Sequence, residues 1–227
     1  MDNKEEKLSR MYKLRFPERE LATREKLWKV LVDNFLQEYI KNDDTVLDLG
    51  GGLCSFINNV KCGKKYVVDL NPNLNKYANK DVIAIQESAN HIPSVSDGCV
   101  DVVFVSNFFE HLRNMDELDK VIEEIKRILR PSGLLLVIQP NIKYAYREYW
   151  DFPDHHLAIT DNSLSELLMI NDFHIKTCFP RFLPWSPKSS RLSNIIFLLK
   201  IYLRMPVIWR FMGKQLFLVA QKIPSKS

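Results

Sequence analysis

Thr45-Val-Leu-Asp-Leu-Gly-Gly-Gly, residues 45–52, is the stretch that decides the fold of this chain, and Tyr66-Val-Val-Asp-Leu, residues 66–70, follows it. The two runs predict a buried strand, a glycine turn, a helix and a second strand that ends in a carboxylate. A Rossmann-like sheet presents a nucleoside at the carboxyl ends of its strands in this way. Gly50 and Asp69 are 19 positions apart, which suits a carboxylate that reaches ribose hydroxyls.

Two details of the glycine turn favour one class of nucleoside over another. Glycines let the backbone approach a ligand, but Ser55 stands where a dinucleotide-binding turn has its third glycine. Asp48 lies two residues before the turn, where a carboxylate could meet a cationic amine. A nucleoside joined to an amino acid therefore fits better than one joined to phosphates. S-adenosylmethionine is such a molecule, and it is the cofactor that we expect.

Length and composition indicate a globular chain with a sizeable core. The chain has 227 residues, of which 46% are hydrophobic and 26% charged. Residues 1–10 are charged and contain no apolar run, so no signal segment is expected there. The four cysteines are scattered without a metal-binding spacing, which is typical of reduced structural thiols. We expect a cytoplasmic protein, with peripheral contact to a membrane left open.

Charge is distributed unevenly along the chain. Residues 173–227 contain ten Lys and Arg residues and no Asp or Glu. Such asymmetry favours an anionic partner, for which phosphate groups, a membrane face and nucleic acid are the candidates. The alternative is a small basic insertion that packs on a more acidic core.

The pattern of apolar residues alternates between helix and strand. A helix is predicted over roughly residues 18–40, and further helices over 115–129 and 163–170. Short β-branched and aliphatic runs predict strands near residues 45–49, 65–69, 82–85, 100–105, 134–138, 173–179 and 215–221. This alternation predicts an α/β fold with a mostly parallel sheet and right-handed crossovers.

Six motifs occur in the order found in class I S-adenosylmethionine-dependent methyltransferases, which the chain resembles over roughly residues 40–180. The motifs are Val46-Leu-Asp-Leu-Gly-Gly-Gly, Val68-Asp, Ala89-Asn-His-Ile-Pro, Cys99-Val-Asp-Val-Val, Phe109-Glu-His-Leu and Ile128-Leu-Arg-Pro-Ser-Gly. The resemblance implies a Rossmann-like sheet of seven strands in the order 3-2-1-4-5-7-6, with strand 7 antiparallel and helices on both faces. Gln139-Pro-Asn-Ile-Lys-Tyr and Pro180-Arg-Phe-Leu-Pro look like a bacterial subgroup without an assigned substrate.

The same resemblance implies a single methyltransferase domain over residues 1–227. Its parts would be an N-terminal helical segment (1–40), the Rossmann-like core (41–180), a basic apolar insertion (180–214) and the closing strand (215–221). The long connection before the last strand agrees with an antiparallel strand 7.

The resemblance also implies which residues hold the methionine part of the cofactor. Gly50, Gly51 and Gly52 would line it, and Asp48 would act on its ammonium group directly or through water. Cys54 replaces a glycine that is common in the family, so the approach of this loop to the ligand departs from the family pattern.

Further cofactor contacts are implied after the later strands. Asp69 would accept hydrogen bonds from both ribose hydroxyls, with Leu70 next to it. Ser88 and Ala89 occupy the adenine-edge position, where the family often has Asp before a small residue. Recognition there would rest more on the Ala89 backbone. The positions beside the sulfonium are Asn107 and Phe108.

Two groups of residues are candidates for catalysis. Methyl transfer needs in-line positioning and exclusion of water, and an oxygen or nitrogen acceptor also needs a base. Glu110 and His111 follow strand 4, while His155 and His156 follow an aromatic loop after strand 5. Each histidine could accept a proton near neutral pH or simply hold its loop in place. Their spacing predicts no metal site, although Glu110, His111 and a later histidine could hold an ion.

The insertion between Pro180 and Lys214 predicts a helix that is apolar on several sides. Its longest apolar run has five residues, too few to span a membrane. Burial as a lid or core element, an oligomer contact and seating in a membrane interface remain open. Trp185 and Trp209 suit the last two, and the residues expected to meet an anionic acceptor are Arg191, Lys200 and Arg204.

The sequence therefore predicts a methyltransferase with a small-molecule, glycan- or lipid-linked acceptor, methylated at oxygen. An RNA or other nucleic-acid methyltransferase is one alternative, favoured by the basic tail. Ser106-Asn-Phe-Phe, however, differs from the Asn-Pro-Pro-Tyr-like motif of enzymes that methylate base amines. A noncatalytic S-adenosylmethionine-binding protein and a nicotinamide oxidoreductase are the others, the last opposed by Ser55 and Asp48. The oligomeric state is left open.

Overall fold

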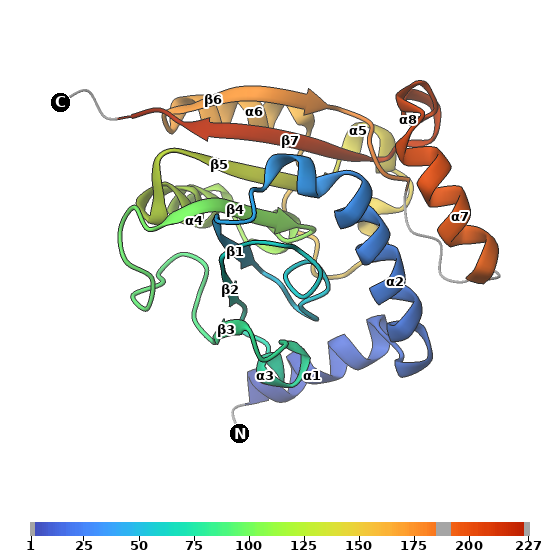
Figure 1. The fold of residues 1–227 in the computed structure, drawn as a ribbon, viewed down its shortest axis with the longest axis horizontal. Coiled ribbons are helices and arrows are strands. Elements are labelled where there is room, and N and C mark those ends of the chain that lie inside the picture. The colour runs from blue at the N-terminus through green and yellow to red at the C-terminus, as the bar shows by residue number, and fades with distance from the viewer. Residues whose placement is uncertain (1–2, 185–191, 225–227) are drawn as a thin grey trace.

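The computed structural model describes residues 3–184 and 192–224 (Figure 1). Seven strands form one sheet in the order β3-β2-β1-β4-β5-β7-β6. They are β1 (Thr45–Leu49), β2 (Lys64–Val68), β3 (Val82–Ile85), β4 (Val100–Ser106), β5 (Leu129–Pro140), β6 (Phe173–Phe179) and β7 (Gln215–Lys222). β7 is antiparallel to both β5 and β6, and the other pairs are parallel. The predicted α/β class, strand order and antiparallel strand are confirmed.

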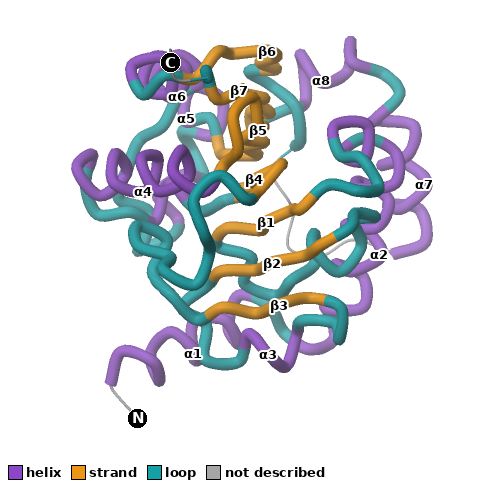
Figure 2. Tube along the Cα trace, turned by 60° about the vertical axis from the view of Figure 1, so that its left-hand side comes forward, coloured by secondary structure: helices purple, strands orange, loops and turns teal. Residues whose placement is uncertain are grey.

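Helices cover both faces of this sheet. They are α1 (Asn3–Arg15), α2 (Glu18–Asn34), α3 (Leu74–Tyr77), α4 (Met115–Ile128), α5 (Ile142–Ala145), α6 (Asp161–Ile170), α7 (Leu192–Leu203) and α8 (Pro206–Met212), with short 3-10 helices η1 (Leu36–Tyr39), η2 (Phe109–His111) and η3 (Tyr149–Asp151). Figure 2 shows α4 and α6 on one side of the strands, and α2, α7 and α8 on the other. The sheet is therefore a central layer between two helical layers.

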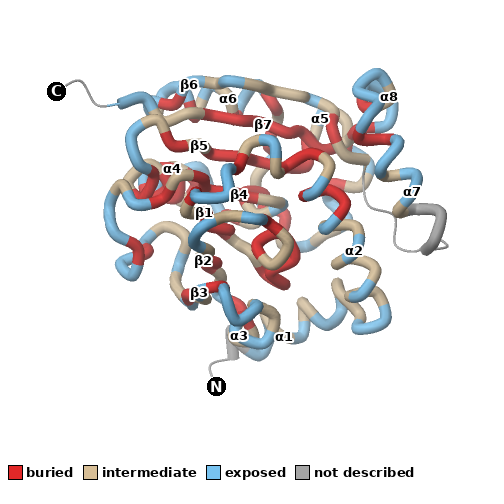
Figure 3. The backbone as a smooth tube through the Cα atoms, in the orientation of Figure 1, coloured by how far each residue is buried: buried red, intermediate tan, exposed pale blue. Residues whose placement is uncertain are grey.

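The core follows from alternation along the strands. Leu47 and Val103 point into the layer formed with α4 and α6, whereas Val46 and Phe104 point toward α2 and α7. Successive side chains of a strand face opposite sides, so a strand covered on both faces is apolar throughout. Figure 3 shows the resulting buried centre, in which β1, β4, β5 and β7 are mostly buried.

The prediction of a helix directly after the glycine turn is wrong, because residues 52–59 form a series of turns. Gly52 and Cys54 have φ angles of 52° and 59°, in the left-handed region that a right-handed helix excludes. A few hydrogen bonds still have helical spacing, such as that from the Asn58 N–H to the Cys54 carbonyl. The turn therefore keeps the chain close to the edge of the sheet instead of starting a helix.

The N-terminal segment consists of two helices followed by a 3-10 turn. The helix predicted over residues 18–40 ends at Asn34 in the structure, and α1, which precedes it, was not predicted. Pro17 separates α1 from α2 and stands at the N-cap of α2. Proline has no N–H to donate, so it is tolerated at a helix start but not inside one. Figure 1 shows α1 crossing below the sheet near α3, at an angle to α2.

The basic insertion contains α7 and α8, which pack beside α2. The inner side of these helices joins the core through Tyr202, Leu203 and Trp209. Phe197 and Phe211 on the outer side are exposed. Arg191 and Trp185, expected to take part in this surface, lie outside the described residues. Within the described part of the chain, every helix is too short or too polar to cross a bilayer.

Candidate active site at the carboxyl edge of the sheet

The glycine turn lies where the strand order reverses between β1 and its neighbours β2 and β4. In open α/β sheets this switch point is where ligands bind. A Cβ atom on Gly51 would lie 2.4 Å from Val67 Cγ2 and 2.8 Å from Asp48 Oδ2. The Gly50 N–H donates to the Val68 carbonyl at 2.8 Å, which fastens the turn to β2. Only glycine fits at position 51, so the backbone is bare at this point.

Asp69, directly after β2, points its carboxylate at the same turn. Its Oδ2 accepts from the Gly52 N–H at 2.9 Å, and its Oδ1 accepts from the Asn71 N–H at 2.7 Å. The Tyr12 hydroxyl donates to either oxygen at 3.4 Å. Burial raises the pKa of Asp69, while these donors and His111 lower it in part. Tyr12 thus takes the position at this carboxylate that ribose hydroxyls are expected to take.

Asp48, at the end of β1, is only 2% exposed. Burial and the nearby Asp69 carboxylate raise the pKa of Asp48 to about 8. A hydrogen bond from the Ile57 N–H and the charge of Arg24 lower this pKa, but by less. The Arg24 guanidinium stacks on Phe16, with its Cζ 4.6 Å from the ring centroid. Its Nε is buried and has no hydrogen-bond partner in the described part of the chain. A buried cation with a free N–H, close to a buried acid, is equipped to meet an α-amino acid.

Two aromatic side chains cover the glycine turn. A Cβ atom on Gly50 would lie 2.6 Å from Phe108 Cδ2, and one on Gly52 would lie 3.1 Å from the Tyr12 hydroxyl. Phe108 follows β4, whereas Tyr12 comes from α1. The donor set fits S-adenosylmethionine, with carboxylates for the ammonium group and the ribose and a cation for the carboxylate. Tyr12 and Phe108 have to yield space to it.

The other expected cofactor residues also follow strand ends at this edge. Leu70 is exposed beside Asp69, and Ser88 is exposed in the loop after β3. Ala89 packs against the core, and Ser88 forms an isolated bridge with His91. Asn107 is exposed with a φ of 49°, and its N–H donates to the Ile138 carbonyl at 2.9 Å. Their cofactor contacts stay predictions.

Glu110 and His111 lie in η2, immediately beyond the end of β4. His111 Nδ1 lies 3.0 Å from the Asp154 carbonyl oxygen and 3.2 Å from Asp154 Oδ2. Glu110 is 1% exposed, and its Oε2 accepts from Gln139 Nε2 at 2.7 Å. Burial raises the pKa of Glu110. Burial alone would lower the pKa of His111, but Asp154 and Glu110 raise it above its usual value.

The two histidines of the later loop point in different directions. His155 is buried against His111, Tyr149 and Phe152, with ring centroids 5.0 Å away in each case. Burial and the neighbouring His111 lower the pKa of His155 to about 4. His156 is exposed, and its backbone N–H donates to the Glu110 carbonyl at 2.7 Å. The fold therefore brings His155, and not the side chain of His156, to Glu110 and His111.

Three functional candidates from the N-terminal segment were not predicted from the sequence: Tyr12, Arg15 and Arg24. Arg15 forms an ion pair with Asp154, next to His111. Burial opposes ionisation of Asp154, but His111 and Arg15 lower the pKa of this carboxyl well below its usual range. No local motif marks these three residues, because their roles depend on where α1 and α2 dock.

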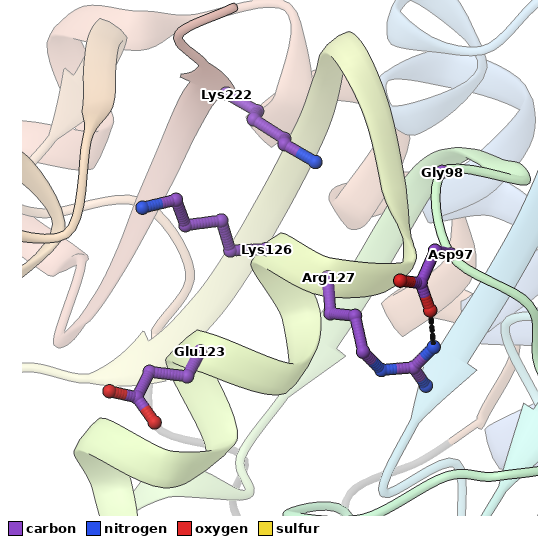
Figure 4. A pocket seen from close by; sticks show the side chains of 6 residues that line it. All are labelled: Asp97, Gly98, Glu123, Lys126, Arg127 and Lys222. Atoms are coloured by element: carbon purple, nitrogen blue, oxygen red, sulfur yellow. Dashed lines mark hydrogen bonds and ion pairs between the residues drawn. The ribbon is translucent and has the colours of Figure 1, made fainter. Parts of the chain in front are cut away.

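The open surface depression shown in Figure 4 lies at the opposite edge of the sheet, before β4 and after α4. Arg127 and Asp97 form an ion pair there, and Lys126 pairs with Asp172 at 2.6 Å. Lys222 donates to the Leu129 carbonyl at 2.6 Å. These cations are already engaged, so the depression does not compete with the carboxyl edge as a candidate site.

Comparisons with known proteins agree with this geometry. Residues 47–137 match a family described as "Methyltransferase domain". A ubiquinone/menaquinone biosynthesis C-methyltransferase from Haemophilus ducreyi is 29% identical over 114 residues, a match that spans 44% of this chain and 42% of that protein. The chain thus matches less than half the length of this curated relative.

Solved structures resemble the chain over most of its length. One is a SAM-dependent methyltransferase from Archaeoglobus fulgidus, with a TM-score of 0.63 and 19% identity over 90% of this chain and 98% of the other. Another, from Thermotoga maritima, has a TM-score of 0.64 and 14% identity over 94% and 99%. At such identities these likenesses show the fold, and the family match shows the domain. Residues 47–137 therefore resemble a methyltransferase domain, and the chain as a whole has the Rossmann-like fold of the S-adenosylmethionine-dependent methyltransferases.

Proposed function

We propose that this chain transfers the methyl group of S-adenosylmethionine to an oxygen atom of a small-molecule, glycan- or lipid-linked acceptor. The observation that carries the proposal is the meeting of Asp48, Asp69 and the bare Gly51 backbone at one switch point of the sheet. When bound, the cofactor supplies a methyl group on a sulfonium, which is an activated donor. The chain therefore has mainly to position the two reactants and exclude water.

The residues after β4 are the ones that we expect to serve the acceptor. Glu110 and His111 lie four and five residues beyond the end of β4, next to Phe108, which covers the glycine turn. The His111 ring is held by Asp154, and the Glu110 carboxylate by Gln139. In this proposal the His111–Glu110 pair accepts the proton of an acceptor hydroxyl, because both groups titrate above their usual range.

The surface of α7 and α8 supports an anionic and lipid-linked acceptor, with peripheral contact to a membrane. Phe197 and Phe211 are 64% and 76% exposed, and Lys200 and Arg204 are exposed on the same helical segment. An apolar surface with cations beside it suits a bilayer interface with anionic head groups.

A carbon acceptor is the second candidate. The Haemophilus ducreyi relative is named a C-methyltransferase and is 29% identical to this chain over 114 residues. A carbon acceptor that is activated as an enolate or phenolate needs the same nearby base, so the cluster at His111 serves either reaction.

A labelled-methyl transfer assay tests the proposal. The protein is incubated with S-adenosylmethionine labelled in its methyl group and with cell extracts separated into small molecules, lipids, glycans and RNA. We expect label in the lipid or glycan fraction, released by mild hydrolysis if it is attached through an ester oxygen. Label in RNA would contradict the acceptor class, and no label beside normal cofactor binding would contradict the activity. Calorimetry should show micromolar-scale cofactor affinity without competition from NAD.

A further inference from the structure

Glu110, His111 and His155 form a compact cluster of metal-binding groups. The first two come from η2 after β4, and His155 comes from the loop after η3. One donor atom from each residue can be chosen so that all three lie within 4.8 Å of one another. His111 and His155 are 44 residues apart, so their spacing alone predicted no metal site, although Glu110, His111 and a later histidine were named as residues that could hold an ion.

We propose that Glu110, His111 and His155 bind one divalent transition-metal ion of the Zn²⁺ type. Two imidazoles and one carboxylate are a ligand set that such ions prefer in proteins. Ca²⁺ and Mg²⁺ prefer oxygen ligands, so the two imidazole nitrogens discriminate against them.

His155 provides an independent reason to expect a ligand. It is only 8% exposed, and its Nδ1 is buried without a hydrogen-bond partner in the described part of the chain. Buried polar atoms are rarely left unpaired, because losing water without gaining a partner is costly. The ring is held by stacking on Phe152, and the following N–H of His156 bonds to the Glu110 carbonyl. The loop is therefore fastened so that this imidazole stays next to the cluster.

The second layer of contacts matches that of known metal sites. Both partners of His111 Nδ1 are oxygen acceptors on Asp154, so Nδ1 carries the hydrogen. The lone pair is then on Nε2, which lies 4.0 Å from Glu110 Oε1. Metal-binding histidines usually donate their second ring nitrogen to a carboxylate or carbonyl, and metal-binding carboxylates are usually hydrogen-bonded as well. Gln139 supplies that second bond at Glu110.

The cluster needs only a small contraction to hold an ion. Metal–ligand distances of about 2.0–2.2 Å place the donors of a tetrahedral site about 3.3 Å apart. Glu110 Oε1 and His111 Nε2 are 0.7 Å farther apart than that, at 4.0 Å. The three donor atoms lie within 4.8 Å of one another, so the largest closure needed is about 1.5 Å.

The site would also keep a free coordination position. The side chain of His111 is 26% exposed, whereas Glu110 is almost fully buried. Three protein ligands leave a fourth position for an oxygen of water or of the acceptor, and a hydroxyl bound there would lose its proton more easily, so in the ion-loaded protein the ion would replace His111 and Glu110 in activating the acceptor. Only this link to the acceptor rests on the proposed function; binding of the ion does not.

Titration of the chelator-treated full chain, produced without an affinity tag of histidines, tests the site. Calorimetry with Zn²⁺ and visible absorption with Co²⁺ should show one ion per chain and a four- or five-coordinate Co²⁺ spectrum with nitrogen ligands. Glu110→Gln and His155→Gln should each weaken binding at least about 10-fold, and Asp154→Asn about 10-fold. His156→Gln is the matched control, since it removes an exposed neighbouring imidazole, and it should bind the ion like the wild type.

The outcome does not depend on any single variant folding. The wild type alone must bind one ion and gain thermal stability from it, and a wild type that binds no ion overturns the proposal. Equal losses in His155→Gln and His156→Gln would also overturn it, because the ion would then sit on the surface. Ion binding without methyl transfer to any fraction supports the site and contradicts the proposed function. Methyl transfer by a wild type that binds no ion does the reverse.

Discussion

The buried carboxyl of Asp48 makes the stability of the ligand-free protein depend on pH. Its pKa of about 8 lies far above that of the same group in an unfolded chain, about 3.9. The folded state therefore holds a proton that the unfolded state releases. The stability from this group is complete below about pH 4 and is lost as the pH rises through 8. At about 1.4 kcal/mol per pKa unit, the loss is on the order of 5 kcal/mol.

Asp48→Asn removes this titration while keeping the shape of the side chain. Unfolding in urea at pH 5 and pH 8 should show that the wild type loses several kcal/mol more than the variant over this range. Titrating groups away from Asp48 contribute equally to both proteins, so the difference between them reports on Asp48 and the groups coupled to it, chiefly Asp69. Parallel loss of stability in the two proteins would refute the reasoning, because it would mean that Asp48 is ionised in the folded state.

The same substitution predicts a proton signature for cofactor binding. An ammonium group placed beside Asp48 favours the ionised carboxylate, so binding at pH 7 should release a proton. Calorimetry in two buffers with different ionisation enthalpies measures that release. We expect it in the wild type and not in Asp48→Asn, whose affinity should also fall. Equal enthalpies in the two buffers for the wild type would contradict the contact.

Three further changes test other parts of the site. Asp69→Ala should cost about 2–4 kcal/mol of S-adenosylmethionine binding in calorimetry, since it removes a charged acceptor for both ribose hydroxyls; unchanged affinity would exclude Asp69. Gly51→Ala should lower the free energy of unfolding by about 1–3 kcal/mol, because its Cβ would meet Val67 Cγ2 at 2.4 Å; an unshifted melting temperature would contradict this close approach. Neutralising Lys200 and Arg204 should weaken acceptor use and its salt sensitivity in steady-state kinetics, with cofactor binding unchanged.

A matched control accompanies the last of these changes. Lys80 and Lys120 are exposed and lie away from α7, so their neutralisation removes the same charge without touching the insertion. Thermal unfolding separates an effect on acceptor use from a loss of folding. If a well-folded Lys200 and Arg204 variant uses the acceptor like the wild type at every salt concentration, the anion-binding role of α7 is wrong.

The sheet could be predicted from the sequence because its strands are short apolar runs with clear ends. Val46–Leu49 and Val100–Val105 are apolar on both faces apart from Asp48 and Asp101, as expected for strands covered on both sides. The prediction of a helix after the glycines was wrong because Cys54 has a positive φ. Cysteine rarely adopts such an angle, so the residue type gives no sign of it. The local sequence pattern predicts the strands and helices, but it does not predict the backbone of the turn at the carboxyl edge of the sheet, where residues adopt unusual φ angles.

The candidate site was predictable only where it follows strand ends. Asp48 and Asp69 reach the carboxyl edge because they lie within or directly after a strand, and Glu110 follows β4 by four residues. Nothing in the pair His155-His156 shows which ring turns inward, since this depends on the packing of Tyr149 and Phe152. The contributions of α1 also require the tertiary fold, because its helix is polar and carries no motif.

Helix α1 contacts both sides of the candidate site, the side expected to bind the methyl donor and the side expected to bind the acceptor. Tyr12 reaches the carboxylate of Asp69, the residue expected to bind the ribose, and one turn later Arg15 pairs with the carboxylate of Asp154, which contacts His111. If a ribose takes the place of the Tyr12 hydroxyl at Asp69, Tyr12 has to move, and Arg15 lies three residues further along the same helix. Binding of the methyl donor would then be felt at Asp154 through α1, so we expect the donor to influence how the acceptor side is held.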